Sequence, residues 1–253
     1  MTILPCTPQQ RAASIEQATT VLSTGGLVVL PTDTVYGIAA DAFDADAVAA
    51  LLAAKGRGRQ MPPPVLVATP AMLDVLAVDV APAARALAEA FWPGALTIIV
   101  RAQPTLTWDL GETAGTVALR MPDHEVALDL LRATGPLAVS SANRTGAPAA
   151  TTAQGAKDQL GARVAGYLDD GEAPGGQPST IVDATGPRLR IVRDGAIDRA
   201  RLAAVVPHLG EVEEAAQVEE VEEVDVVDVV DGEATDEPAA SDEARDGDAG
   251  QPG

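Results

Sequence analysis

Short apolar runs alternate with segments of helical periodicity along residues 1–210. Runs rich in β-branched residues predict strands, and they lie at residues 27–30, 65–68, 96–100, 116–120, 136–140, 179–183 and 189–192. Segments rich in Ala and Leu predict helices, and they lie at residues 14–23, 45–55, 84–91, 125–133 and 151–160, with a last helix near residue 198. Strands with interspersed helices predict a layered domain of α and β elements with one twisted β-sheet.

The predicted helix at residues 45–55 carries clear local signals at both ends. Asp44 precedes it, and an aspartate there accepts hydrogen bonds from the free N–H groups of the first turn. Gly56 follows it, and glycine readily adopts the left-handed conformation that commonly ends a helix. We therefore expect this helix to begin after Asp44 and to end before Gly56.

Polar side chains appear repeatedly where predicted strands end. The run LVVL at 27–30 stops at Pro-Thr-Asp-Thr, and the helix at 45–55 runs out into Lys55-Gly56-Arg57. The other groups of this kind are Arg120, Ser140, Ser141, Asn143, Ser179 and Arg193. Ligand crevices of open sheets lie at strand ends, and guanidinium groups bind carboxylates or phosphates bidentately. These groups predict a pocket for a small anionic ligand that bears hydroxyl groups.

Each of these residues also has a purely structural interpretation. Cations such as Lys55 and Arg57 suit a helix C-terminus, and arginines near strand ends can be surface residues. Serine and asparagine suit turns and helix caps. His124 is either a general base at a helix start or a structural, capping residue. The sequence has no P-loop, no G-x-G-x-x-G after a strand and no G-x-S-x-G motif, which excludes those phosphate, dinucleotide and hydrolase sites.

Composition narrows the class of protein. Aromatic residues make up only 2% of the chain, so stacking platforms for single-stranded RNA are not expected. One cysteine, Cys6, excludes an intrachain disulfide, and with two histidines a zinc site is not expected. No apolar run approaches the ~20 residues of a membrane helix. We therefore expect a soluble, cytoplasmic protein with no membrane contact.

The net charge of −20 is concentrated at the C-terminal end of the chain. Residues 211–253 hold 17 acidic residues and one arginine, a charge of −16, which leaves −4 for residues 1–210. A segment of this composition is predicted to be a disordered acidic tail. It is either a solubilising extension or a segment with a partner-binding or autoinhibitory role.

Several stretches resemble, in order, the landmarks of the threonylcarbamoyl-AMP synthases, the YrdC-like family. They include PTDTVYG, KGR, FWPGALTIIV, VALRMPDH, SSANRTG, PSTIVD and IVRDGAI. The resemblance spans roughly residues 14–200 and indicates the short, single-domain type. It implies an N-terminal extension at 1–13, a YrdC-like catalytic domain at 14–207, and the acidic tail at 208–253. The implied fold of the catalytic domain is α+β, with a twisted, mixed β-sheet flanked by helices and a concave ligand face.

The resemblance also implies an activity. A nucleotidyltransferase of this family joins L-threonine, bicarbonate or carbon dioxide, and ATP into threonylcarbamoyl-adenylate and pyrophosphate. Magnesium would be held mainly by the ATP phosphates, with no metal site of the protein itself. The product would pass to a separate transferase complex that modifies adenosine 37 of tRNAs reading ANN codons, with weak tRNA contact by this chain.

The family's motifs assign roles to residues of this sequence. The residues implied to bind threonine are Thr34, Arg120, Ser140 and Ser179, with Ser140 lying between the two substrates. The residues implied to surround ATP are Lys55, Arg57, Ser141, Asn143 and Arg193. No residue is implied to form a covalent intermediate, and Lys55 and Arg57 would contribute by positioning.

Residues 58–64 depart from the family pattern, and Leu66 stands roughly where relatives have a histidine. One substrate contact would then be lost, or replaced by Arg59. Two other functions stay open on the sequence: a double-stranded RNA or tRNA-binding module, and carbamoyl-adenylate chemistry for maturation of a metallocentre. The negative charge of residues 1–210 weakens the first, and the absence of zinc-finger and acylphosphatase segments weakens the second.

Overall fold

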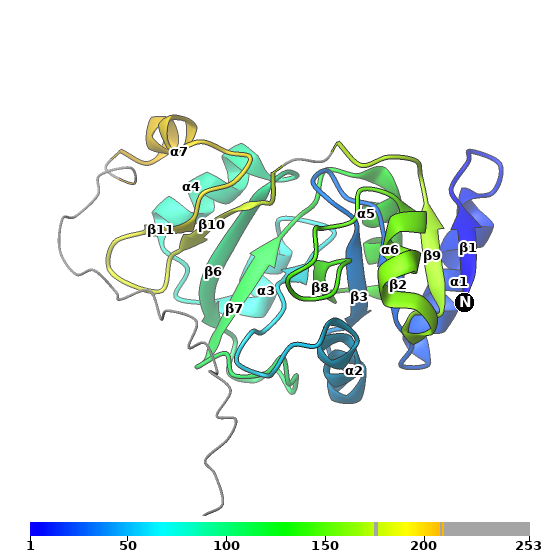
Figure 1. Ribbon diagram of the computed structural model, residues 1–253. Coiled ribbons are helices and arrows are strands. Elements are labelled where there is room, and N and C mark those ends of the chain that lie inside the picture. Colours follow the sequence, from blue (N-terminus) through cyan, green and yellow to red (C-terminus); the bar gives the residue numbers. More distant parts are fainter. Residues whose placement is uncertain (175–176, 208, 210–253) are drawn as a thin grey trace, which may run out of the picture. The chain divides into compact units, whose positions relative to one another are not determined.

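One mixed β-sheet of eleven strands runs through the part of the chain that the structure describes (Figure 1). This computed structural model describes residues 1–174, 177–207 and 209, all of which belong to the compact unit Met1–Val212. The predicted disordered tail at 208–253 lies outside the described residues, apart from residue 209.

The strands are β1 (Thr2–Pro5), β2 (Val28–Leu30), β3 (Gly37–Asp41), β4 (Val65–Leu66), β5 (Ala77–Val78), β6 (Leu96–Ala102), β7 (Thr116–Arg120), β8 (Leu137–Ser141), β9 (Gly166–Asp169), β10 (Thr180–Asp183) and β11 (Arg190–Arg193). They are ordered β1-β9-β2-β3-β8-β4-β7-β6-β10-β11, and β5 pairs with β6. Parallel and antiparallel neighbours both occur, since β2 pairs antiparallel with β3 but parallel with β9. The predicted mixed sheet is therefore confirmed.

The helices are α1 (Arg11–Ser23), α2 (Ala45–Lys55), α3 (Met72–Leu76), α4 (Pro82–Phe91), α5 (Glu125–Thr134), α6 (Ala153–Leu160) and α7 (Arg199–Val205), with a 3-10 turn, η1, at Gly161–Arg163. None of them is long and apolar enough to cross a membrane, within the residues that the structure describes.

Two hydrophobic clusters lie on opposite faces of the sheet. On one face α2, α4 and α6 contribute to a cluster that includes Leu51, Leu87 and Leu160. On the other face α1 and α5 contribute Leu22 and Leu130 to a second cluster with residues of β2, β3 and β8. This second cluster contains no residue of β6, β7, β10 or β11, so α1 and α5 leave that part of the face uncovered.

The helix α2 forms as its sequence predicts. The Asp44 carboxylate accepts hydrogen bonds from the N–H groups of Asp46 and Ala47, both at 3.0 Å. Gly56 ends the helix in the left-handed conformation, with φ 71°. The end of α2 therefore delivers Lys55 and Arg57 to fixed positions.

The expected N-terminal extension at residues 1–13 is corrected by the structure. Residues Thr2–Pro5 form β1, which pairs parallel with β9, and Leu4 and Cys6 are buried. The first residues therefore belong to the same sheet and core as the rest of the domain, and α1 already begins at Arg11.

Strands β1, β3, β5 and β9 were not predicted from the sequence, and for β3 the reason is its composition. The segment Gly37–Asp41 reads GIAAD, and glycine and alanine are depleted in strands. It becomes a strand because it pairs antiparallel with β2 on one side and with β8 on the other. Because β2 ends at Leu30 and β3 begins at Gly37, this pairing fixes both ends of the loop of residues 31–36 and so positions Thr32, Asp33 and Thr34.

We expect the substitution Asp44→Ala to lower the free energy of unfolding by about 1 kcal/mol, because two N–H groups lose their acceptor. Denaturant titration of the variant and the unaltered protein measures this difference. Asp44→Asn keeps an acceptor oxygen and should remain close to the unaltered protein. Equal losses for the alanine and asparagine variants would contradict the capping role.

Candidate active site

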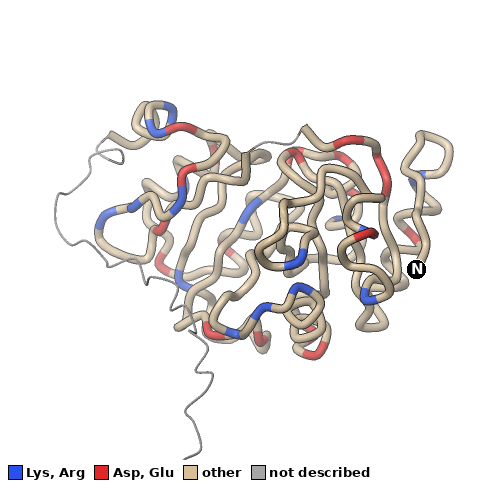
Figure 2. The backbone as a smooth tube through the Cα atoms, viewed as in Figure 1, with Lys and Arg blue, Asp and Glu red and all other residues tan. Residues whose placement is uncertain are grey.

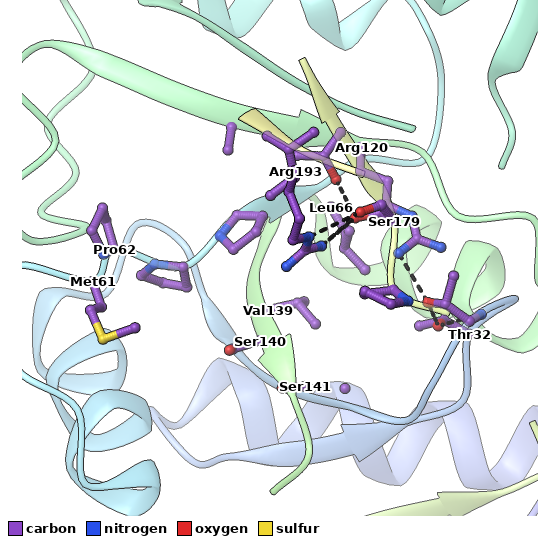
Figure 3. Close-up of a pocket in the computed structure, with 18 of the residues that line it drawn as sticks. Thr32, Met61, Pro62, Leu66, Arg120, Val139, Ser140, Ser141, Ser179 and Arg193 are labelled. Carbon is purple, nitrogen blue, oxygen red and sulfur yellow. Dashed lines mark hydrogen bonds between the residues drawn. The ribbon is translucent and has the colours of Figure 1, made fainter. Parts of the chain in front are cut away.

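The uncovered part of the sheet face carries a cavity of about 530 Å³ (Figure 3). Paired residues of neighbouring strands point to the same face of a sheet. Register pairs Leu66 with Arg120, Ile99 with Ala118, and Ile181 with both Thr97 and Arg193. All of these residues line the cavity, so strands distant in sequence supply its floor.

Arg120 lies at one end of the cavity, at the end of β7, and is 7% exposed. Its Nη2 donates to Asp33 Oδ1 at 2.6 Å, its Nη1 to Thr34 Oγ1 at 3.1 Å, and its Nε to the Gly94 carbonyl at 3.0 Å. Burial lowers the pKa of Arg120, and the Asp33 carboxylate opposes that shift. Asp33 and Thr34, in the polar segment after β2, therefore hold the Arg120 guanidinium group at the cavity.

The Thr34 hydroxyl has a defined role in this contact. Thr32 Oγ1 donates to the Val35 carbonyl at 2.6 Å and lies 3.0 Å from Thr34 Oγ1. A hydroxyl carries one proton, so Thr34 donates to Thr32 and accepts from Arg120. Its second lone pair is available to accept a hydrogen bond from a ligand.

Ser179 and Arg193 form a second polar group on the cavity wall. Arg193 Nη2 donates to the Ser179 carbonyl at 2.8 Å and to Ser179 Oγ at 3.1 Å. Ser179 Oγ also lies 2.8 Å from Thr97 Oγ1. Burial lowers the pKa of Arg193, and the positive charges of Arg120 and Arg57 lower it further.

Arg57 brings a third guanidinium group to the cavity from the segment after α2. Its Nη1 donates to Ser140 Oγ at 3.0 Å, and burial lowers its pKa. Its Nε is buried and has no hydrogen-bond partner among the described residues. Figure 2 shows basic positions along this segment and on the β11 side of the sheet.

The cavity is therefore electropositive. Of Arg57, Arg120 and Arg193, only Arg120 forms an ion pair with a carboxylate within the described part of the chain. Three guanidinium groups beside one carboxylate favour an anionic ligand. The oxygens of such a ligand can accept bidentate pairs of hydrogen bonds from the remaining N–H donors. The hydroxyls of Thr34, Ser140, Ser141 and Ser179 lie beside them.

Lys55 and Asn143 lie behind the cavity wall and do not line it. Lys55 is 1% exposed, and its Nζ donates to the carbonyls of Ser141 and, at 2.8 Å, Asn143, and to Asn143 Oδ1 at 3.2 Å. The Lys55 carbonyl in turn accepts from the N–H and hydroxyl of Thr145, both at 3.0 Å. Lys55 therefore ties the end of α2 to the turn after β8. Direct nucleotide contact by Lys55 and Asn143 stays a prediction.

Of the two alternatives for residues 58–66, a lost family contact or its replacement by Arg59, the structure favours the first. The Arg59 side chain is 55% exposed, pairs with Asp109 and does not line the cavity. Leu66 is 4% exposed and does line it, so it presents an apolar surface beside Arg120.

Neither His124 nor Cys6 reaches the cavity lining. His124 precedes α5 without a side-chain capping bond, its Nε2 lies 3.6 Å from Asp170 Oδ2, and burial lowers its pKa. Burial raises the pKa of the Cys6 thiol to about 11, which opposes a nucleophilic role.

Sequence reasoning missed two groups of lining residues. Thr97 is a buried polar residue within the apolar run of β6, and that interruption was its only local signal. The second group comes from loops rather than strand ends, and it includes Met61, Pro62, Pro63, Pro64, Leu110 and Thr113.

The chain is similar to proteins of one family. The family model Sua5_yciO_yrdC, described as telomere recombination, matches residues 20–195. A Mycobacterium tuberculosis relative named as a threonylcarbamoyl-AMP synthase is 52% identical over 199 residues, covering 79% of this chain and 92% of its own. The Bacillus subtilis threonylcarbamoyl-AMP synthase is 38% identical over 195 residues, covering 76% of this chain and 56% of its own.

A solved structure is also similar. The Pyrococcus abyssi Sua5 structure complexed with L-threonine has a TM-score of 0.78 and 32% identity to this chain. The match covers 82% of this chain but only 61% of the Pyrococcus chain, so this chain spans less than two thirds of that protein.

Stability should depend on the protonation of Lys55. Burial lowers the pKa of Lys55 from 10.5 to about 7. Between these two pKa values the unfolded chain binds a proton that the folded protein does not, so the free energy of unfolding rises with pH. The rise is at most about 1.4 kcal/mol per pH unit, and Lys55→Met should lack it. Denaturant titration at about pH 6 and about pH 9 measures the slopes.

Lys157→Met is the matched control, because residue 157 lies outside the cavity lining and outside the turn that Lys55 holds. This variant should keep the pH slope of the unaltered protein. Equal slopes in all three proteins would show that Lys55 stays protonated in the folded state.

Proposed function

This chain belongs to the Sua5/YciO/YrdC family, and on that premise we propose that it is a threonylcarbamoyl-AMP synthase. As a nucleotidyltransferase it would join L-threonine, bicarbonate or carbon dioxide, and ATP into threonylcarbamoyl-adenylate and release pyrophosphate. The observation that carries the proposal is the cavity in which Arg57, Arg120 and Arg193 meet beside one carboxylate and several hydroxyls. These groups suit a pair of ligands that both carry negative charge.

The amino acid would bind at the Arg120 end of the cavity. The hydrogen bonds of Arg120 to Asp33, Thr34 and Gly94 use three of its five N–H donors. The remaining donors suit the threonine carboxylate. Thr34 can accept a hydrogen bond from the amino or hydroxyl group of threonine, and Ser179 lies on the same wall.

The triphosphate would bind between Arg57 and Arg193, beside Ser140 and Ser141. In the reaction, the threonine amine attacks carbon dioxide and loses a proton, or attacks bicarbonate with loss of water, and either route gives a carbamate. A carbamate oxygen then attacks the α-phosphorus of ATP. The bond from that phosphorus to the bridging oxygen breaks, and pyrophosphate leaves. The guanidinium groups would offset the charge that gathers on the phosphoryl oxygens, so this chain contributes positioning and electrostatics.

Magnesium would enter with the ATP phosphates. Among the described residues no group of three or more His, Cys, Asp or Glu is arranged to hold a metal ion, and the Asp33 carboxylate is engaged by Arg120. This donor set fits a metal ion held mainly by phosphate oxygens, which would supply additional charge neutralisation.

The product would pass to a separate transferase complex for the modification of adenosine 37 in tRNAs reading ANN codons. A cytoplasmic location and weak tRNA contact are parts of this proposal. The alternative of an RNA-binding module is not favoured, because relatives that cover most of this chain are named as synthases. A cavity of about 530 Å³ also suits small molecules.

The test is pyrophosphate release by purified protein with ATP and magnesium, adding threonine and bicarbonate singly and together. Release should require both. Loss of a hydrogen bond to a charged ligand group costs about 1.5–3 kcal/mol. Arg120→Ala should therefore raise the threonine KM, and Arg57→Ala the ATP KM, each by about tenfold to hundredfold.

Arg85→Ala is the matched control, because Arg85 pairs with Asp74 on the surface and does not line the cavity. It should retain both KM values. The absence of release under every combination would refute the synthase proposal, and tRNA binding would then be measured.

A further inference from the structure

Two loops that are distant in sequence form one side of the cavity. Residues 58–64 follow α2 and contribute Met61 and three consecutive prolines, and residues 108–113 lie between β6 and β7 and contribute Leu110 and Thr113. We call these two segments the two-loop wall. Figure 3 shows Met61 and Pro62 on the side of the cavity opposite Arg120 and Ser179.

The two loops are joined by contacts that lie outside the cavity. Arg59 Nη2 donates to both carboxylate oxygens of Asp109, at 2.7 and 3.0 Å. The Glu112 N–H donates to the Arg59 carbonyl at 2.8 Å, and the Gly111 N–H to Asp109 Oδ1 at 3.1 Å. Side-chain and backbone contacts thus converge on Arg59, two residues after Arg57.

Gly111 makes the close approach possible. Its φ is +107°, a conformation that residues with a side chain rarely adopt. A Cβ atom built at Gly111 would lie 2.6 Å from the Arg59 carbonyl oxygen, which is backbone and cannot simply rotate away. Only glycine allows residues 108–113 to lie against residues 58–64 at this distance.

The wall has a different chemistry from the rest of the cavity. Met61, Pro62 and Leu110 are apolar, and proline rings hold φ fixed, so the surface is rigid as well as apolar. In the view of Figure 3, Arg193, Val139 and Ser140 lie between this wall and the Arg120 end. A ligand with phosphates at Arg57 and Arg193 would therefore place its flat, weakly polar part against the wall.

We propose that Arg59, Asp109 and Gly111 are positioning residues that hold the two-loop wall in place as the surface for the base of the bound nucleotide. The inference rests on the proposed function and deepens it, because it assigns nucleotide affinity to contacts that do not touch the ligand. The Arg59 side chain is 55% exposed and outside the lining, so its effect passes through the loops.

The central experiment compares Gly111→Ala with Gly115→Ala. Gly115 also has positive φ, +77°, but a Cβ atom there meets nothing within 4 Å. The two variants therefore share backbone strain, and only Gly111→Ala forces the loops apart. Calorimetry measures the binding of a non-hydrolysable ATP analogue and, separately, of pyrophosphate, which carries no base.

Gly111→Ala should weaken the ATP analogue about tenfold, in line with the usual cost of overpacking, and leave pyrophosphate affinity unchanged. Gly115→Ala should bind both probes like the unaltered protein. Equal weakening of both probes, or the same effect from both glycine variants, would overturn the inference. Thermal unfolding of both variants checks that each is folded.

A charge reversal tests the ion pair. Arg59→Asp and Asp109→Arg should each raise the ATP KM severalfold without changing the threonine KM. The double variant should recover part of the loss, because it restores the ion pair but still lacks the Asp109 oxygen that accepts from the Gly111 N–H. Arg85→Asp, which breaks the surface pair with Asp74, is the control and should leave both KM values unchanged. An ATP KM in the double variant no lower than in either single variant would refute the positioning role of this pair.

The outcomes separate this inference from the proposed function. If the unaltered protein neither binds the ATP analogue nor releases pyrophosphate, the synthase proposal fails and the inference falls with it. If the unaltered protein is active and the variants of Gly111, Arg59 and Asp109 retain its nucleotide affinity, only the inference fails.

Discussion

The alternation of side chains along a β-strand determines where this molecule can bind a ligand. Every second residue of β6, β7, β10 and β11 points to one face, and the cluster under α1 and α5 on that face contains no residue of these four strands. The cavity-lining residues on the uncovered strands include threonine and arginine, with isoleucine and alanine between them. A shift of register by one residue would turn Arg120 into the core and Leu119 into the cavity.

Burial of positive charge gives the cavity its selectivity. Burial lowers the pKa of Arg57, Arg120 and Arg193, and the first two also lower the pKa of the third. Holding these groups together without an equal number of carboxylates costs free energy in the ligand-free protein. An anionic ligand offsets that cost, so the same arrangement that weakens the empty fold strengthens binding. Asp33 lowers the free-energy cost of burying Arg120, because its carboxylate accepts a hydrogen bond from the guanidinium group. The same carboxylate oxygen accepts from the Asp123 N–H, which links the loop after β2 to the segment after β7.

Residues outside the cavity lining hold the segments that form its walls. Lys55 holds the turn after β8 through carbonyl oxygens, and its own carbonyl is held by Thr145. Arg59 holds the two-loop wall in a comparable way, through Asp109 and Glu112. Arg57 lies between these two anchored residues in the sequence, so its backbone is held on both sides, and its guanidinium group is held by Ser140. Neither Lys55 nor Arg59 lines the cavity, although both are basic residues beside it.

The sequence alone determined the features that depend on near neighbours in the chain. Asp44 and Gly56 act within a few residues, so the ends of α2 were predicted, as were the strong strands β6 and β7 and the position of Arg120 at the end of β7. Arg57, Arg120, Ser179 and Arg193 were also identified from the order of their motifs, and the structure places all four on the cavity.

Tertiary structure decided what depends on distant partners. Strands β1 and β3 form because β9, β2 and β8 supply hydrogen bonds, and the two-loop wall exists because Gly111 can approach Arg59. The position of Lys55 outside the cavity lining also depends on distant partners, because its ammonium group donates to the carbonyl groups of residues 141 and 143, far along the chain.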